Sequence, residues 1–70
     1  MEHKTVGNNL KTFRRELGLT QADLAERVGV ARVSINSIET GRFIPTIETA
    51  LQISKALDIP IDKIFWLKEK

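Results

Sequence analysis

The side chains best suited to contacting another molecule lie between residues 32 and 40. Within this segment, Ile35 and Ile38 indicate the buried face of a short helix. At 100° per residue, five side chains lie on or beside the opposite face: Arg32, Val33, Asn36, Ser37 and Thr40. Side chains of these types hydrogen-bond to base edges or touch thymine methyl groups, and a nine-residue helix about 14 Å long fits a major groove about 12 Å wide. The segment therefore predicts a helix that contacts the bases of double-stranded DNA in the major groove.

Catalysis and metal binding find no support in the sequence. It contains no cysteine and one histidine, His3, which argues against thiolate chemistry and Cys/His zinc sites. Ser34 and Ser37 have no histidine base, and Asp58 and Asp62 are better explained as helix-end residues than as a catalytic pair. There is also no glycine-rich phosphate loop. We expect a protein that is not an enzyme and uses no metal and no cofactor.

Length and charge narrow the class of protein further. Seventy residues suffice for one domain, 1–70, and no apolar run exceeds the four residues 64–67, so we expect neither a membrane span nor a signal peptide. Residues 1–42 carry seven Lys and Arg against five acidic residues, whereas residues 43–70 carry four of each. An anionic partner should therefore meet the first part of the chain. We expect a cytoplasmic protein that is associated with the nucleoid when bound to DNA.

Apolar periodicity and capping residues predict an all-α domain. The expected helices are five and short, at 8–17, 21–28, 32–40, 47–57 and 61–65. In the fourth helix we expect a buried stripe that comprises Ile47, Ala50, Leu51, Ser54 and Leu57. The tail has two interpretations, because residues 65–67 also favour a strand, which could pair with a second short strand at 3–6.

The second and third helices, with the turn between them, form a helix-turn-helix unit at 21–40. Ala25 is small enough to let the two helices cross closely, and Gly29 can take the left-handed conformation that the turn requires. Apolar side chains of both helices share one core, which leaves the third helix with one free face.

These residues resemble the phage-repressor type of helix-turn-helix, the Cro and lambda-repressor-like (XRE-type) DNA-binding family. The resemblance covers about residues 8–65. It is carried by Arg14-x-x-x-Gly18-Leu19-Thr20-Gln21-x-x-Leu24-Ala25, by Val28-Gly29-Val30, by Ser34-Ile35-x-x-Ile38-Glu39-x-Gly41 and by Pro45. It implies a five-helix fold and a sequence-specific regulator of transcription, a repressor or autoregulator. In one departure, Ala31 stands where many members have Ser or Thr, which removes a helix cap worth roughly 1 kcal/mol.

The resemblance also implies a role for individual residues. The positions that correspond to base-reading residues are Arg32, Val33, Ser37 and Asn36. Those assigned to phosphates are Thr20, Gln21, Thr40 and Arg42. Gln21 would also buttress Arg32, and Arg14 and Glu39 would form a semi-buried ion pair.

The C-terminal segment is the expected site of dimerisation. Four adjacent large apolar side chains cannot all face inward on a helix or a strand, so some must meet another chain: Ile64, Phe65, Trp66 and Leu67. By resemblance, a homodimer would pair terminal strands or fifth helices and would bind a pseudo-palindromic operator. Three alternatives remain: an antitoxin with a protein partner, a restriction controller, and a protein-interaction module without DNA binding.

Overall fold

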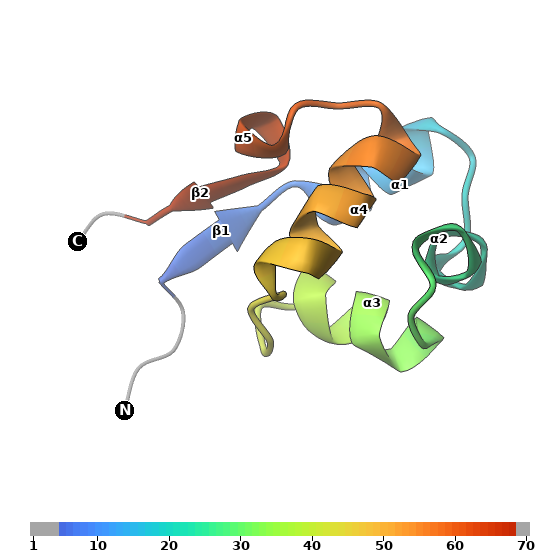
Figure 1. Ribbon diagram of the computed structural model, residues 1–70, viewed down its shortest axis with the longest axis horizontal. Coiled ribbons are helices and arrows are strands. Elements are labelled where there is room, and N and C mark those ends of the chain that lie inside the picture. The colour runs from blue at the N-terminus through green and yellow to red at the C-terminus, as the bar shows by residue number, and fades with distance from the viewer. Residues whose placement is uncertain (1–4, 69–70) are drawn as a thin grey trace.

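The computed structural model describes residues 5–68. Within that range the chain forms five helices and two short strands (Figure 1). In chain order they are β1 (Val6–Asn8), α1 (Leu10–Glu16), α2 (Gln21–Val28), α3 (Arg32–Glu39), α4 (Ile47–Leu57), α5 (Ile61–Ile64) and β2 (Phe65–Leu67). The mostly helical fold with short terminal strands is confirmed. No described helix is long and apolar enough to cross a membrane.

Several predicted boundaries shift by one or two residues. Helix α1 begins at Leu10 rather than at residue 8, because Asn8 belongs to β1. The Asn8 side chain nevertheless binds the start of α1, because Asn8 Oδ1 accepts a hydrogen bond of 3.0 Å from the backbone N–H of Leu10. Helices α3 and α5 each end one residue earlier than expected. Residues 3 and 4 of the predicted strand lie outside the described range.

The hydrophobic core draws side chains from all five helices. The largest fully buried side chains are Leu10, Leu24, Ile35, Ile38, Ile53 and Ile64. Burial of each aliphatic side chain of this size contributes about 1.5–3 kcal/mol, which offsets the entropy lost when such short helices form. Helices α2 and α3 each pack on this core through one apolar face, and their opposite faces are left at the surface.

The predicted stripe of α4 is wrong for two of its residues. Ile47 and Leu51 are exposed, whereas Ala50, Ile53 and Leu57 are buried. Both sets fit a helical period, but α4 packs on α2 and α5 through the second set. Rotation about the helix axis, which periodicity alone leaves open, is thus fixed by tertiary contacts.

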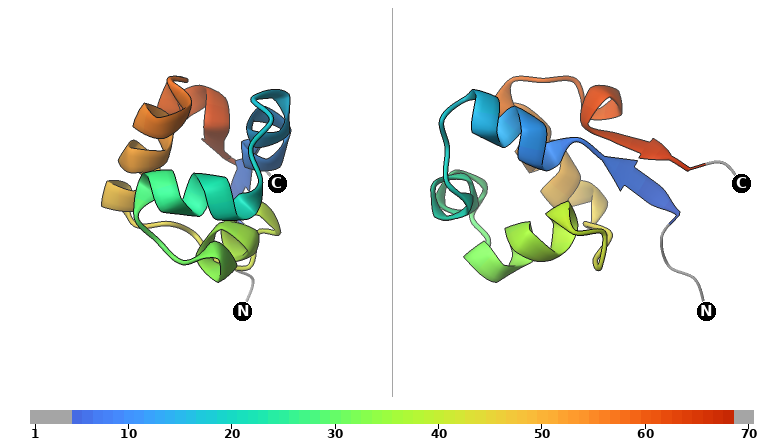
Figure 2. Two further views of the ribbon diagram at one scale, coloured as in Figure 1. Left: turned by 90° about the vertical axis from the view of Figure 1, so that its right-hand side faces the viewer. Right: turned by 180° about the vertical axis from the view of Figure 1, so that it is seen from behind.

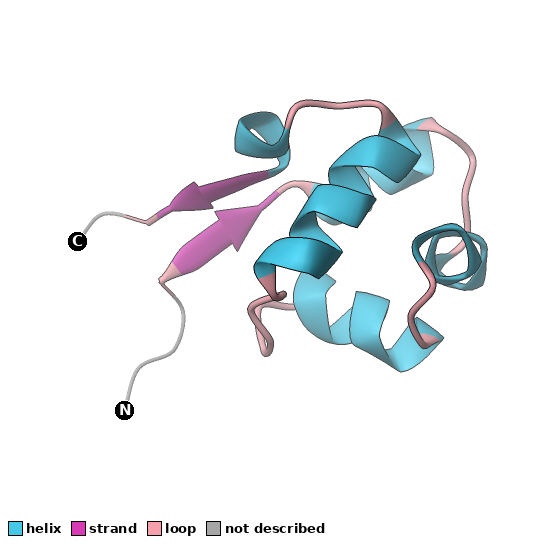
Figure 3. Ribbon diagram, viewed as in Figure 1, coloured by secondary structure: helices cyan, strands magenta, loops and turns pink. Residues whose placement is uncertain are grey.

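Strands β1 and β2 pair as an antiparallel sheet (Figure 3). Asn8 pairs with Phe65, Gly7 with Trp66, and Val6 with Leu67. Gly7 lies so close to the indole of Trp66 that a Cβ at this position would collide with the ring. The absence of a side chain at Gly7 therefore allows the Trp66 ring to lie across β1.

Ile64 must be removed from the predicted dimer interface. Its side chain is 0% exposed within the protomer and belongs to the core, and Phe65 packs against that core. The change from helix to strand at Phe65 turns the following residues outward, so Trp66 is partly exposed and Leu67 is 78% exposed. Only the last part of the predicted apolar segment is therefore available to a second chain.

The N-terminus of α2 has a complete capping box. The Thr20 side chain accepts a hydrogen bond of 2.9 Å from the Asp23 N–H, and Asp23 Oδ2 accepts one of 2.9 Å from the Thr20 N–H. The bond from the Thr20 N–H, assisted by the Thr20 side chain and Arg27, lowers the pKa of Asp23 below its ordinary value.

We expect Thr20→Ala to lower the free energy of unfolding by about 1 kcal/mol, because a backbone N–H at the helix start loses its acceptor. The Asp23 contribution should be complete above about pH 5 and should be lost as the pH falls through its lowered folded pKa. Urea unfolding of both proteins at pH 7 and pH 3 tests this. Equal stability of the variant and the parent at pH 7 would show that the cap is unimportant.

Candidate nucleic-acid interface

The two helices of the predicted helix-turn-helix unit meet at a tight turn. Helix α2 is followed by its C-cap, Gly29, whose φ of 88° lies in the left-handed region. The N–H groups of Gly29 and Val30 both donate to the Ala25 carbonyl, at 2.8 and 3.0 Å. Ala25 is buried where α2 packs on α3. This arrangement makes α3 leave the turn in a fixed direction.

Helix α3 lies at one margin of the molecule, with α5 on the opposite side (Figure 2). Arg32 and Val33 are exposed, and Asn36 and Ser37 are partly buried at the helix surface. Beside them is a shallow hollow of about 240 Å³. Its lining residues are Val33, Ser34, Ser37, Arg42 and Phe43. All four predicted base-reading residues are therefore accessible, wholly or in part, on one side of α3.

Backbone hydrogen bonds hold the turn after α3, one of them from the Gly41 N–H to Ile38 O at 3.1 Å. The N–H groups of Arg42 and Phe43 donate to Ser37 O at 3.0 and 3.2 Å. The Thr40 hydroxyl donates to Asn36 O and Ser37 O, at 3.0 and 3.2 Å, so its single proton is already engaged within the helix end. Arg42 is exposed next to the hollow. Phe43, which sequence reasoning missed, is fixed there by its backbone bond.

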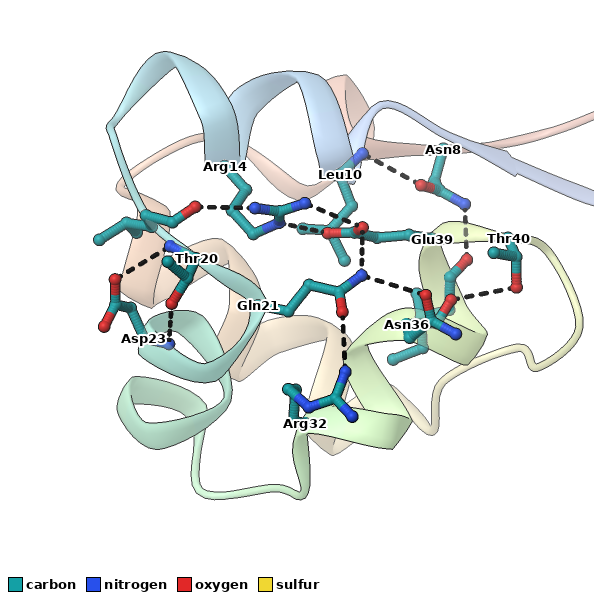
Figure 4. A network of polar contacts seen from close by, with 12 residues as sticks. Asn8, Leu10, Arg14, Thr20, Gln21, Asp23, Arg32, Asn36, Glu39 and Thr40 are labelled. Carbon is teal, nitrogen blue, oxygen red and sulfur yellow. Dashed lines mark hydrogen bonds and ion pairs between the residues drawn. The ribbon is translucent and has the colours of Figure 1, made fainter.

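Arg14 and Glu39 form a nearly buried ion pair (Figure 4). Arg14 Nε donates to Glu39 Oε2 at 2.6 Å, and Arg14 Nη2 donates to Glu39 Oε1 at 3.2 Å. The two side chains are 8% and 2% exposed. Arg14 Nη1 also donates to the Leu19 carbonyl at 2.7 Å, which fastens the loop between α1 and α2. This bidentate geometry is the strong form of an Arg–carboxylate contact.

Gln21 connects the ion pair to the surface of α3. Its Nε2 donates to Glu39 Oε1 at 3.0 Å and to Asn36 Oδ1 at 3.1 Å. Its Oε1 accepts a bond of 3.3 Å from Arg32 Nη1. A continuous chain of polar contacts therefore runs from the nearly buried ion pair to an exposed guanidinium (Figure 4).

Asn8 is a further polar residue that sequence reasoning did not assign to this region. Its Nδ2 donates to the Ile38 carbonyl at 3.0 Å, so β1 supports the end of α3. Nothing in the spacing of Asn8 predicted this contact, which spans 30 residues of sequence. The remaining predicted residue, Thr20, is exposed at the start of α2 with its oxygen in the capping box.

Comparisons with known proteins give the family. A helix-turn-helix family model matches residues 10–64. An HTH-type transcriptional regulator of Methanothermobacter thermautotrophicus is 48% identical over 61 residues, which are 86% of this chain and 88% of the relative.

Two solved structures extend the likeness. The P22 c2 repressor in complex with a synthetic operator has a TM-score of 0.74 and 36% identity, over 76% of this chain and 80% of that one. The restriction-modification controller C.AhdI of Aeromonas hydrophila has a TM-score of 0.74 and 30% identity, over 77% and 82%. These matches confirm the resemblance drawn from the motifs: the chain belongs to the helix-turn-helix family of transcriptional regulators, of the phage-repressor type.

Proposed function

We propose that this protein is a sequence-specific, non-catalytic regulator that represses transcription, its own or that of another gene, by inserting α3 into the major groove. The observation that carries the proposal is the division of α3 into two faces. Ile35 and Ile38 are fully buried, while Arg32 and Val33 are exposed on the opposite side. An Arg guanidinium pairs with guanine O6 and N7, and a Val methyl contacts a thymine methyl.

The remaining base-reading residues are proposed to be Ser37 and Asn36, which flank Val33 on the same surface. Phosphates would be held at both ends of the unit, by Thr20 and the backbone N–H of Gln21 at the α2 N-terminus and by Arg42 after α3, because the Gln21 side-chain amide is engaged by Glu39 and Asn36. Thr40 would join them only if its hydroxyl left its two helical acceptors. Phosphate contacts fix the register of the protein on the duplex, and base contacts supply the sequence preference.

Alanine substitutions separate these two groups of residues. Arg32→Ala and Ser37→Ala should each weaken binding to the selected site by about 1–3 kcal/mol, because each removes hydrogen bonds to a base. Binding to random duplex of equal length should stay nearly constant. Titrations of both duplexes at one salt concentration measure the difference.

Arg42→Ala is the matched control for Arg32→Ala, since both remove one exposed Arg. It should weaken specific and random binding alike and should flatten the slope of log affinity against log salt by about one unit. If Arg32→Ala and Arg42→Ala gave the same loss on both duplexes, the assignment of α3 to base reading would be refuted.

The active form is proposed to be a homodimer joined through β2. One edge of β2 pairs with β1, and Leu67, next to Trp66, is 78% exposed. A second copy would cover these apolar side chains about a two-fold axis. Such a dimer would place two α3 helices about 34 Å apart, which corresponds to one turn of DNA.

A restriction controller is the second candidate function. The likeness to C.AhdI, 30% identical over 77% of this chain, favours it. A selected binding site that lies before a restriction endonuclease gene in the source genome would support this role. A site before unrelated genes would leave the general regulator as the function.

A further inference from the structure

Glu39 fixes the orientation of the polar side chains that lie beneath the exposed face of α3. A carboxylate only accepts hydrogen bonds, and Glu39 receives three, two from Arg14 and one from Gln21 Nε2. Its side chain is 2% exposed, so water has little access to it. The Glu39 carboxylate therefore acts as a fixed acceptor against which neighbouring amides must orient.

The Gln21 side-chain amide can donate to the Glu39 carboxylate in only one orientation. Its NH₂ group must face Glu39, because turning the amide over would set its oxygen against the carboxylate. Its Oε1 then points to Arg32, whose guanidinium can only donate. The position of the Arg32 head group thus depends on an acceptor that Glu39 has oriented.

The orientation of Asn36 follows from the same constraint. The Gln21 NH₂ group also donates to Asn36 Oδ1 at 3.1 Å. Within the part of the chain that the structure describes, Asn36 Nδ2 donates no hydrogen bond, and Asn36 lies partly exposed on α3 (Figure 4). The Asn36 oxygen is therefore bound to Gln21, and the Asn36 NH₂ group is left as a donor for a ligand.

We propose that Glu39 is a positioning residue for DNA recognition: through Gln21 it sets the position of the Arg32 guanidinium and makes Asn36 offer a hydrogen-bond donor to the major groove. This inference rests on the proposed function and specifies the operator chemistry. The bases opposite both residues should carry acceptors, such as guanine O6 and N7, adenine N7 or thymine O4. Cytosine, which presents an N4 donor, should be disfavoured opposite Asn36.

The wild-type protein supplies the first test. The base pair read by Asn36 is identified as the one at which Asn36→Ala abolishes the preference. Wild type should bind duplexes with an acceptor there at least about fivefold better than those with cytosine, the lower bound for one base contact. A preference for cytosine would overturn the proposal. If wild type selected no sequence at all, the proposed function itself would fail.

Glu39→Gln tests the positioning role directly. The new amide keeps the shape. Its oxygen, in the place of Oε2, accepts from Arg14 Nε, whereas its NH₂ group, in the place of Oε1, faces Gln21 and also Arg14 Nη2, which loses its bond. Gln21 must then reverse, which sets its own NH₂ group against Arg32. The ratio of specific to random affinity should fall about tenfold, as for the loss of one base contact, while random binding stays constant. A folded Glu39→Gln protein with an unchanged ratio would overturn the proposal.

Arg14→Lys is the control for a merely structural effect. It breaks the bidentate contact and the bond to the Leu19 carbonyl, but it keeps a positive charge beside Glu39 and leaves Gln21 oriented. Thermal stability should fall, whereas the specificity ratio should stay within about twofold of wild type. Equal losses of specificity in Arg14→Lys and Glu39→Gln would show that both act only through stability.

The exchange Gln21→Glu with Glu39→Gln provides a rescue. The carboxylate introduced on α2 would accept from both the new amide and Arg32, so the preference at the Arg32 base pair should return. Asn36 would donate to that carboxylate with its oxygen outward, as it would donate to the reversed Gln21 in the single Glu39→Gln variant, so in both variants its preference should reverse toward cytosine, which presents a donor. If the preference at the Arg32 base pair did not return in the double variant, Gln21 would not transmit the effect.

Discussion

Glu39→Ala is expected to lower the free energy of unfolding by about 3–5 kcal/mol, the usual cost of removing one partner from a buried ion pair. The reason is that the Arg14 guanidinium, whose side chain is 8% exposed, keeps only the Leu19 carbonyl as an acceptor. Gln21 Nε2 also loses its bond to the carboxylate. Thermal or urea unfolding measures the loss, which is a large part of the stability of a 70-residue domain.

Glu26→Ala is the matched control, because Glu26 is an exposed carboxylate on α2. Its effect should stay within about 0.5 kcal/mol. The double change of Arg14→Met with Glu39→Leu should recover much of the lost stability, since it leaves no unpaired charge in the interior. A Glu39→Ala protein as stable as Glu26→Ala would contradict the structural role of the pair.

Leu67→Asp is expected to convert a dimer into a monomer. Leu67 is 78% exposed, so the change should leave the protomer folded while placing a charge in the proposed interface. A monomer binds one half-site, so the advantage of a two-half-site operator over a single half-site, about 100-fold or more for linked sites, should disappear. Analytical ultracentrifugation gives the mass, and paired titrations give the advantage.

Leu17→Asp serves as the control, because Leu17 is another exposed leucine but lies at the C-cap of α1, outside the terminal sheet. It should leave the mass and the two-site advantage unchanged. Truncation after Ile64 is a harsher form of the test, since it also removes Phe65, which packs on the core. A Leu67→Asp protein that still sedimented as a dimer would exclude this segment as the interface.

The sequence was most informative where local chemistry determines structure. The limits of α2 follow from Thr20 at its start and Gly29 at its end, and both residues act as predicted. The free face of α3 followed from Ile35 and Ile38, since only two apolar residues define its inner side. The caps of α2 and the apolar periodicity of α3 each admit only one arrangement.

Prediction was weaker where distant contacts decide between equal local choices. Ile47 and Leu51 fit the helical period as well as Ile53 does, and packing on α2 and α5 selected Ile53. The sequence allowed Ile64 to face either a partner chain or the core. In the structure α5 ends at Ile64 and β2 begins at Phe65, and this geometry places the Ile64 side chain in the core.

The series of polar contacts from Arg14 to Arg32 was predicted only in part. The resemblance implied the contact of Gln21 with Arg32 and the pairing of Arg14 with Glu39. The bond that joins them, from Gln21 to Glu39, links α2 to the far end of α3 and follows from their crossing. The contact of Asn8 with Ile38 likewise requires β1 to lie against α3, which no motif indicated.

Selection of binding sites from random duplex DNA by the wild-type protein tests the central claim most directly. We predict enrichment of a palindromic site whose two half-sites are centred about 10 base pairs apart, bound by two copies of the chain with an affinity that falls steeply with salt. A pool that yields no enriched sequence, or binding that is independent of salt, would contradict the assignment of α3 to reading the major groove.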